Sequence, residues 1–235
     1  MALEKTSTTT PACWWVDLPE TDYPEALDLQ LAVVNAKTGG RLEADVVLSV
    51  EHPRVFTLGR RGGRENLCVT DDFLAQKGVS VVPTDRGGNI TYHGPGQLVV
   101  YPIIDLNRRR LKVVDFVSGL EQAMIRTAGH WGIDAGTDPA NRGVWLDGDK
   151  LGSIGITVRR GVSFHGLALN VNTDMAPFGW INPCGLDQVN MTSFERRLSR
   201  PVPMAEARQH MAAHLAAVFG IALTTVSPEQ LYAVI

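Results

Sequence analysis

Two residues of the sequence have side chains suited to acyl transfer, and both stand in glycine-containing turns. Cys184 lies in the run NPCG, and Lys150 lies in the run GDKLGSIG. The thiolate of a cysteine is a nucleophile, and a nearby ammonium group lowers the pKa of a thiol by stabilising the thiolate. If the loop of Cys184 folds over the turn of Lys150, the pair is a candidate for acyl transfer through a cysteine thioester.

A third segment, RGGNITYHGPGQ at 86–97, has the composition of a binding loop. Glycine lets a backbone approach a ligand closely or adopt a positive φ. Consecutive backbone N–H groups in such a loop can stabilise an oxyanion. The segment lacks the ending of a phosphate-binding P-loop and is not a dinucleotide-binding fingerprint. It is a candidate pocket wall, and a glycine-rich hairpin without a ligand is the alternative.

His93 and His165 are alternative partners for Cys184. A Cys–His pair would indicate papain-like chemistry, although no local signature of that kind is present. His165 stands in a predicted strand, so a histidine that is simply hydrogen-bonded in the core explains it equally well. A lysine beside an Asp-Gly turn is more often exposed, and a lone cysteine is more often inert. These alternatives stay open from the residues alone.

The composition is that of a globular protein. The chain has 235 residues, of which 44% are hydrophobic and 20% charged, with a net charge of -3, and this length supports a full core. The charge does not favour binding to nucleic acid, and no apolar run reaches the roughly 18–20 residues of a membrane span. The three cysteines, Cys13, Cys68 and Cys184, lack the spacing of a disulfide framework or a zinc site. We therefore expect a cytoplasmic protein that binds no metal ion, nucleic acid or membrane.

Hydrophobic patterning predicts an α+β domain. Helices are expected at 23–37, 113–131 and 203–219, each followed by glycine. The dipeptides Asp147-Gly148 and Arg160-Gly161 predict hairpins, and together with separated helices they indicate a mixed, largely antiparallel sheet flanked by helices. We expect a disordered tail at 1–11 and a functional loop at 172–193, which carries Cys184. Strands are expected at 14–18, 45–51, 54–58, 79–83, 90–92, 98–104, 144–146, 151–158, 162–171 and 222–226.

Four segments resemble those of the lipoyl(octanoyl) transferases, in the same order and with the same spacing. They are RGGNITYHGPGQLVVYP at 86–102, KLGSIGI at 150–156, FHGLALNV at 164–171 and NPCG at 182–185. The similarity runs from about residue 47 to about residue 193. Asn89 and the pair Leu151-Gly152 depart from the usual pattern at positions that affect pocket shape more than chemistry.

The resemblance implies a single octanoyltransferase catalytic domain at 12–235, with a fold like that of the biotin and lipoate protein ligases. It implies that Cys184 is the nucleophile that forms the acyl thioester, and that Lys150 lowers the pKa of Cys184 and acts as acid and base. No cofactor and no ATP would be needed. The implied acyl-binding residues are Arg86, Gly87, Gly88, Asn89, Ile90, Thr91, Tyr92, His93, Ser153, Ile154, Gly155, Gly166, Leu167 and Ala168.

The resemblance also implies the partners. Octanoyl-acyl carrier protein would be the donor, and the lipoyl domains of 2-oxoacid dehydrogenases and the glycine cleavage H protein would be the acceptors. Arginines such as Arg60, Arg61 and Arg64 are either solvated surface or a docking site for such acidic domains. Three other functions compete: an ATP-dependent ligase that would not need Cys184, a Cys–His hydrolase, and a non-catalytic module that binds acyl groups or carrier proteins.

Overall fold

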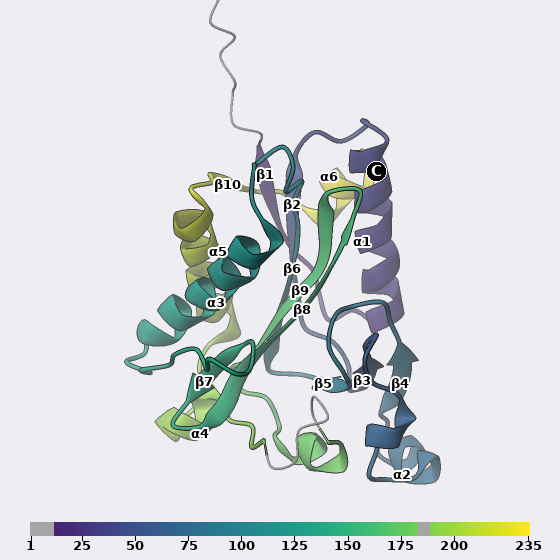
Figure 1. The fold of residues 1–235 in the computed structure, drawn as a ribbon, viewed down its shortest axis with the longest axis vertical. Helices are drawn as coiled ribbons and strands as arrows, with labels where there is room; N and C mark the ends of the chain where they lie inside the picture. Colours follow the sequence, from purple (N-terminus) through teal and green to yellow (C-terminus); the bar gives the residue numbers. More distant parts are fainter. Residues whose placement is uncertain (1–11, 183–188) are drawn as a thin grey trace, which may run out of the picture.

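The computed structural model of the protein describes residues 12–182 and 189–235. A seven-stranded sheet with strand order β10-β1-β2-β6-β9-β8-β7 forms the centre of the fold (Figure 1). β1 runs parallel to β10 and β2, whereas the pairs from β2 to β7 are antiparallel. The predicted mixed, largely antiparallel sheet is therefore confirmed. Its strands are β1 (Cys13–Asp17), β2 (Asp45–Val50), β6 (Gln97–Ile103), β7 (Val144–Leu146), β8 (Asp149–Arg159), β9 (Val162–Asn170) and β10 (Leu223–Thr225).

The two predicted hairpins connect β7 to β8 and β8 to β9. Asp147 and Gly148 have φ values of 51° and 88°, and Arg160 and Gly161 have values of 50° and 85°. Two consecutive positive φ angles are the mark of the type I′ turn, whose twist matches that of the strands it joins. The hairpins give β8 and β9 a continuous register from Gly152↔Leu169 to Arg159↔Val162.

Helices cover both faces of the large sheet (Figure 1). α1 (Tyr23–Thr38) and the short α6 (Pro228–Tyr232) share one core, and α3 (Val113–Gly129) and α5 (Met204–Phe219) share the other. The inward face of α3 carries Phe116, Leu120 and Met124, whose spacing of four residues follows the helical repeat. The predicted helices are thus confirmed. No helix within 12–182 and 189–235 is long and apolar enough to cross a membrane.

A second, three-stranded sheet stands at one end of the large one, in the order β4-β3-β5 (Figure 1). It consists of β3 (Val55–Leu58), β4 (Ser80–Pro83) and β5 (Thr91–His93). The strands were predicted, but their separation into a second sheet was not, because hydrophobic alternation does not specify which strands pair. The 3₁₀ turns η1 (Arg64–Asn66) and η2 (Ala176–Trp180) lie beside this sheet.

Two short helices, α2 (Asp71–Gln76) and α4 (Phe194–Leu198), are absent from the prediction. Each has a side-chain cap that the sequence contains: the Thr70 hydroxyl accepts a hydrogen bond from the Phe73 N–H, and Ser193 accepts one from the Arg196 N–H. Such caps mark helix starts, but these helices are shorter than the window in which periodicity can be recognised.

Candidate active site

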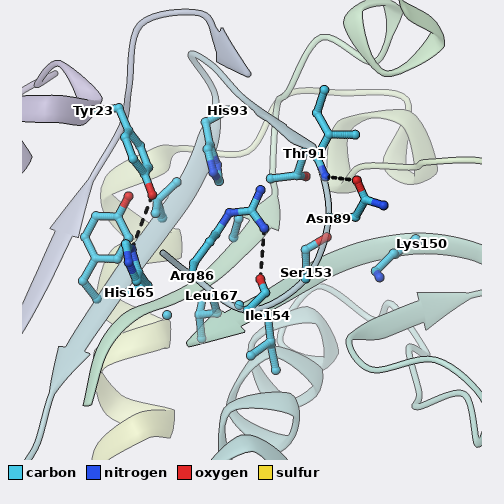
Figure 2. A pocket seen from close by; sticks show the side chains of 18 residues that line it. Tyr23, Arg86, Asn89, Thr91, His93, Lys150, Ser153, Ile154, His165 and Leu167 are labelled. Atoms are coloured by element: carbon cyan, nitrogen blue, oxygen red, sulfur yellow. Dashed lines mark hydrogen bonds between the residues drawn. The ribbon is translucent and has the colours of Figure 1, made fainter. Parts of the chain in front are cut away.

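A pocket lies where the two sheets meet, beside the N-terminus of α1 (Figure 2). It contains about 520 Å³ of empty space, part of which is open to solvent. The pocket is lined by Tyr23, Arg86, Gly87, Gly88, Asn89, Ile90, Thr91, His93, Val99, Tyr101, Lys150, Ser153, Ile154, Gly155, His165, Gly166, Leu167 and Ala168.

The structure thus brings three of the four sequence motifs to one place. The glycine-rich segment forms one wall and the β8–β9 hairpin forms another, and the two meet where the Gly87 N–H donates to the Ile156 carbonyl at 3.1 Å. Tyr23, Val99 and Tyr101 were not among the predicted wall residues. Tyr23 lies outside the four motifs and comes from α1, whereas Val99 and Tyr101 lie in β6, in the part of the first motif that was not assigned to the wall. His165 was considered as a partner of Cys184 or as a hydrogen-bonded core histidine and not as a wall residue, although it directly precedes the wall segment Gly166 to Ala168.

Tyr92 does not line the pocket, which corrects the prediction. Side chains alternate along a strand, so in β5 Thr91 and His93 face the pocket and Tyr92 faces away. Its ring packs against Phe56 and Phe178, with centroid separations of 5.6 and 5.4 Å. Tyr92 is therefore part of the core of the small sheet.

Lys150 lies in the pocket wall and is only 5% exposed, unlike the usual lysine beside an Asp-Gly turn. Its Nζ lies 5.1 Å from the ring centroid of Trp145, within the range of a cation–π contact. Gly143 makes room for the lysine, because a Cβ built at Gly143 would lie 3.0 Å from Lys150 Cε.

A β-bulge explains why Lys150 and Ser153 both reach the pocket. Val144 faces Gly152 and Trp145 faces Lys150, so β8 has one extra residue, Leu151, at this point. An extra residue reverses the alternation of side chains beyond it. Residues three apart, which point to opposite faces in a regular strand, therefore share a face here.

The chain on both sides of the undescribed segment 183–188 borders this pocket. The Asn182 N–H donates to the Asn66 carbonyl at 2.8 Å, and Asn66 Nδ2 donates to Oδ1 of the pocket residue Asn89 at 3.0 Å. On the other side, the Lys150 N–H donates to the Asn190 carbonyl at 2.9 Å. Cys184, the predicted nucleophile, lies between these anchors in the sequence and outside the described residues.

The other two cysteines differ in their surroundings. Cys13 is buried, and burial and the charge of Asp45 raise the pKa of its thiol to about 12. It is therefore not a nucleophile near neutral pH. Cys68 is exposed, and its Sγ lies 3.5 Å from Asn182 Oδ1.

Arg86 and His93 are joined through the hydroxyl group of Thr57. Arg86 Nε and Nη2 donate to Thr57 Oγ1 at 3.1 and 2.8 Å. His93 Nε2 lies 3.4 Å from the same oxygen. Burial, reinforced by the charges of His52 and Arg86, lowers the pKa of His93 well below its usual value. The imidazole is therefore neutral, and the Thr57 O–H can donate to its Nε2.

The same chain of hydrogen bonds continues from His93 to the strand of Lys150. With Nε2 as acceptor, His93 Nδ1–H donates to Gln97 Oε1 at 2.7 Å, and Gln97 Nε2 donates to Asn170 Oδ1 at 2.9 Å. Asn170 Nδ2 donates to the Thr192 carbonyl at 3.0 Å, and the Thr192 N–H donates to the Lys150 carbonyl at 2.9 Å. Because every donor in the chain points the same way, the hydrogen bonds polarise and strengthen one another. The chain connects His93 in the pocket wall to the backbone of Lys150.

His165 occupies the far end of the pocket from Lys150 (Figure 2). It is 1% exposed; its Nε2 lies 2.8 Å from Asp85 Oδ1 and its Nδ1 lies 3.4 Å from the Tyr23 hydroxyl. Burial is the main cause that lowers the pKa of His165, so the ring is neutral near pH 7. A neutral ring with a carboxylate beside Nε2 carries its proton there, and Nδ1 accepts from Tyr23.

Comparisons with known proteins show the family to which the chain belongs. Residues 22–216 match the family model of the lipoyl protein ligase A/B catalytic domain. The octanoyltransferase of Desulfotalea psychrophila is 48% identical over 207 residues, covering 87% of this chain and 93% of the relative. The chain belongs to the octanoyltransferase family. The octanoyltransferase of Syntrophobacter fumaroxidans is 45% identical, with 87% and 89% of the two chains covered. The protein is accordingly an acyltransferase.

Solved structures show the same fold at much lower sequence identity. A bipartite lipoate protein ligase from Thermoplasma acidophilum, solved in a study with its E2 lipoyl domain, matches with a TM-score of 0.74 at 14% identity, covering 96% of this chain and 91% of that one. The biotin protein ligase of Aquifex aeolicus matches with a TM-score of 0.56 at 9% identity, covering 90% and 71%. This octanoyltransferase-family chain therefore has the predicted ligase-like fold.

Acidification is expected to destabilise the fold through buried histidines. Burial lowers the pKa of His52 from 6.5 to about 4, so below pH 6.5 the unfolded chain takes up a proton that the folded chain excludes. The stabilisation is complete above about pH 6.5 and falls as the pH falls toward 4, by up to about 3 kcal/mol. Thermal unfolding from pH 7 to 4.5 should show a smaller loss of stability in His52→Asn than in the wild type. Equal losses would contradict this assignment.

Proposed function

We propose that the protein transfers an octanoyl group from octanoyl-acyl carrier protein to the lysine of a lipoyl domain, through a thioester on Cys184 and without ATP. The observation that carries the proposal is a largely apolar pocket with a buried lysine at one end, in a chain whose relatives are octanoyltransferases. As acceptors we propose the lipoyl domains of 2-oxoacid dehydrogenases and the glycine cleavage H protein.

The pocket offers apolar contacts to an alkyl chain. Its hydrocarbon surface includes the side chains of Val99 and Ala168, which lie on the face of the sheet that packs against α1. Burial of each methylene group is worth about 0.8 kcal/mol, so seven apolar carbons supply several kcal/mol of binding. That binding energy would hold the thioester of the donor at the Lys150 end.

The assignment of Cys184 as nucleophile is supported by its motif and by the chain on either side. Asn182, two residues before it, is linked through Asn66 to the pocket residue Asn89. Asn190, six residues after it, is hydrogen-bonded to Lys150. An ammonium group near the thiol would lower its pKa and raise the thiolate fraction.

In the first half-reaction, the Cys184 thiolate attacks the carbonyl carbon of the donor thioester. The new C–S bond forms as the bond to the phosphopantetheine sulfur breaks, and that thiolate leaves with a proton from Lys150. One thioester replaces another, so no nucleotide is consumed. The oxyanion of the tetrahedral intermediate needs a positioned donor.

The backbone of β8 provides a candidate for that donor. Gly152 pairs with Val144 of β7, and the Ile156 carbonyl accepts a hydrogen bond from the Gly87 N–H. The backbone N–H and C=O groups of Gly152 and Ile156 therefore point to the edge of β8 that faces away from β9. Backbone groups two residues apart in a strand point the same way. The N–H of Ile154, midway between them, therefore points to the same edge, and we assign it as an oxyanion donor.

In the second half-reaction, the ε-amine of the acceptor lysine attacks the acyl-enzyme. The amine must be neutral, and Lys150 accepts its proton as the C–N bond forms. The C–S bond breaks and Cys184 is released as a thiolate. Two successive half-reactions in one site predict ping-pong kinetics.

An arginine pair beside the pocket supports docking of acidic carrier domains. The Arg60 N–H donates to the Arg86 carbonyl and the Arg61 N–H donates to the Gly88 carbonyl, at 3.0 Å each. Both side chains are exposed, and among the described residues neither has an ion pair. Arg64 differs, because both Asp71 carboxylate oxygens accept from its Nη1.

The proposal is tested by mixing the enzyme with octanoyl-acyl carrier protein and a lipoyl domain in the absence of ATP. Mass spectrometry should show one octanoyl group on the acceptor domain. A requirement for ATP and free octanoate would instead indicate a ligase, and release of free octanoate without acceptor modification would indicate a hydrolase.

A further inference from the structure

We propose that His165 and Tyr23 form the wall against which the methyl end of the acyl chain stops, so that these two side chains set the acyl length the enzyme accepts. The inference rests on the proposed function, since it concerns the same pocket. It adds an assignment of chain-length specificity to particular residues.

The spacing of the wall residues along the β8–β9 ladder matches the length of an eight-carbon chain. Along the β8–β9 ladder, Ser153 pairs with Ala168 near the Lys150 end, and Ile156 pairs with His165 at the far end. Three steps of about 3.3 Å separate the two pairs, or roughly 10 Å. Seven carbon–carbon bonds of about 1.5 Å in a zigzag span roughly 9 Å. With its carbonyl at Lys150, an extended octanoyl chain therefore has the length to reach the wall, on a path beside Arg86 and Gly87, which cover the face of Gly155.

A break in the sheet places the imidazole in the pocket. The register in which Val100 of β6 faces Leu167 of β9 continues to Pro102 opposite His165. Proline has no N–H to donate, so the ladder is interrupted there. The His165 N–H instead donates to Gln30 Oε1 of α1 at 2.7 Å, and His165 adopts a φ of 55°.

This conformation is held from several sides. A positive φ is strained for a residue other than glycine, and such strain clusters at functional sites. Gln30 uses its oxygen for His165, while its Nε2 has no hydrogen-bond partner within the described ranges. Asp85 and Tyr23 contact the two ring nitrogens. A longer acyl chain would therefore have to displace a fixed ring from a buried set of hydrogen bonds, and we expect it to be rejected.

Donors of different chain length test the inference. Octanoyl-, decanoyl- and dodecanoyl-acyl carrier protein would be compared by kcat/KM, and we expect the wild type to disfavour decanoyl by at least about tenfold. His165→Gly removes the ring and suits a positive φ; it should use decanoyl at least as well as octanoyl. His165→Asn, which also tolerates this φ, should shift preference in the same direction if the glycine variant fails to fold.

Thr127→Ala is the control for a buried side chain away from the pocket. The Thr127 hydroxyl is buried and donates to the Ala123 carbonyl within α3 at 2.7 Å. This variant should keep the wild-type order of chain lengths. A folded His165 variant that keeps the wild-type preference among the acyl chain lengths would overturn the inference, and the proposed octanoyl transfer would be unaffected by that result. Absence of octanoyl transfer by the wild type would instead overturn the proposed function.

Discussion

Replacement of Lys150 by methionine is expected to slow octanoyl transfer by about 10²–10⁴-fold, the usual contribution of a positioned acid–base group. The Lys150 side chain is buried in the pocket wall, so bulk water has little access to replace its proton transfer. Methionine has a similar length and no charge, so it keeps the packing of the aliphatic stem and removes the acid–base group. Both half-reactions of a folded variant should slow in single-turnover measurements.

Lys150→Arg separates the two roles proposed for the lysine. Arginine keeps the positive charge that favours a thiolate, but it does not give up its proton in proteins. We therefore expect acyl-enzyme formation to be less affected than the attack of the acceptor amine. A folded Lys150→Met enzyme that transfers octanoyl groups at the wild-type rate would contradict both roles.

Replacement of Gly166 by alanine is expected to lower the free energy of unfolding by about 3 kcal/mol or more, the upper range for overpacking. A Cβ at this position would lie 2.0 Å from the Val100 carbonyl oxygen and 2.7 Å from Pro102 Cδ. These atoms belong to β6, in the middle of the sheet, so they cannot move aside without disturbing two other strands. Urea unfolding measures the loss.

Gly129→Ala is the matched control for this change. Gly129 lies at the end of α3, and nothing lies within 4 Å of a Cβ built there. We expect its stability to be unchanged or raised by up to about 1 kcal/mol, because alanine favours a helix. An unfolding midpoint of Gly166→Ala equal to that of the wild type would show that β6 and β9 are not packed as described.

Much of the fold could be predicted because its signals are local. The Asp147-Gly148 and Arg160-Gly161 turns are recognisable as dipeptides, and the helix over Val113–Gly129 has a regular apolar repeat. The glycine-rich segment at 86–97 was found for the same reason, because its composition is typical of loops and close approaches. The wall segment at 166–168, in contrast, came only from the resemblance to the octanoyltransferases.

The remaining features depend on contacts between distant parts of the chain. The burial of Lys150 depends on a bulge opposite β7, and the position of His165 depends on Pro102 in another strand. Tyr23 reaches the pocket from α1, which is distant in sequence from the other wall residues. Tyr92 faces away from the pocket because side chains alternate along β5, whose pairing with β3 the motif does not show. None of these relations can be read from residues near each one in sequence.

Intact-protein mass spectrometry after mixing the enzyme with octanoyl-acyl carrier protein, without ATP or acceptor, tests the central claim most directly. The account predicts a mass gain of one octanoyl group that hydroxylamine removes and that Cys184→Ser does not acquire. An unmodified enzyme that nevertheless octanoylates a lipoyl domain, or a Cys184→Ser variant with wild-type transfer, would contradict the thioester mechanism.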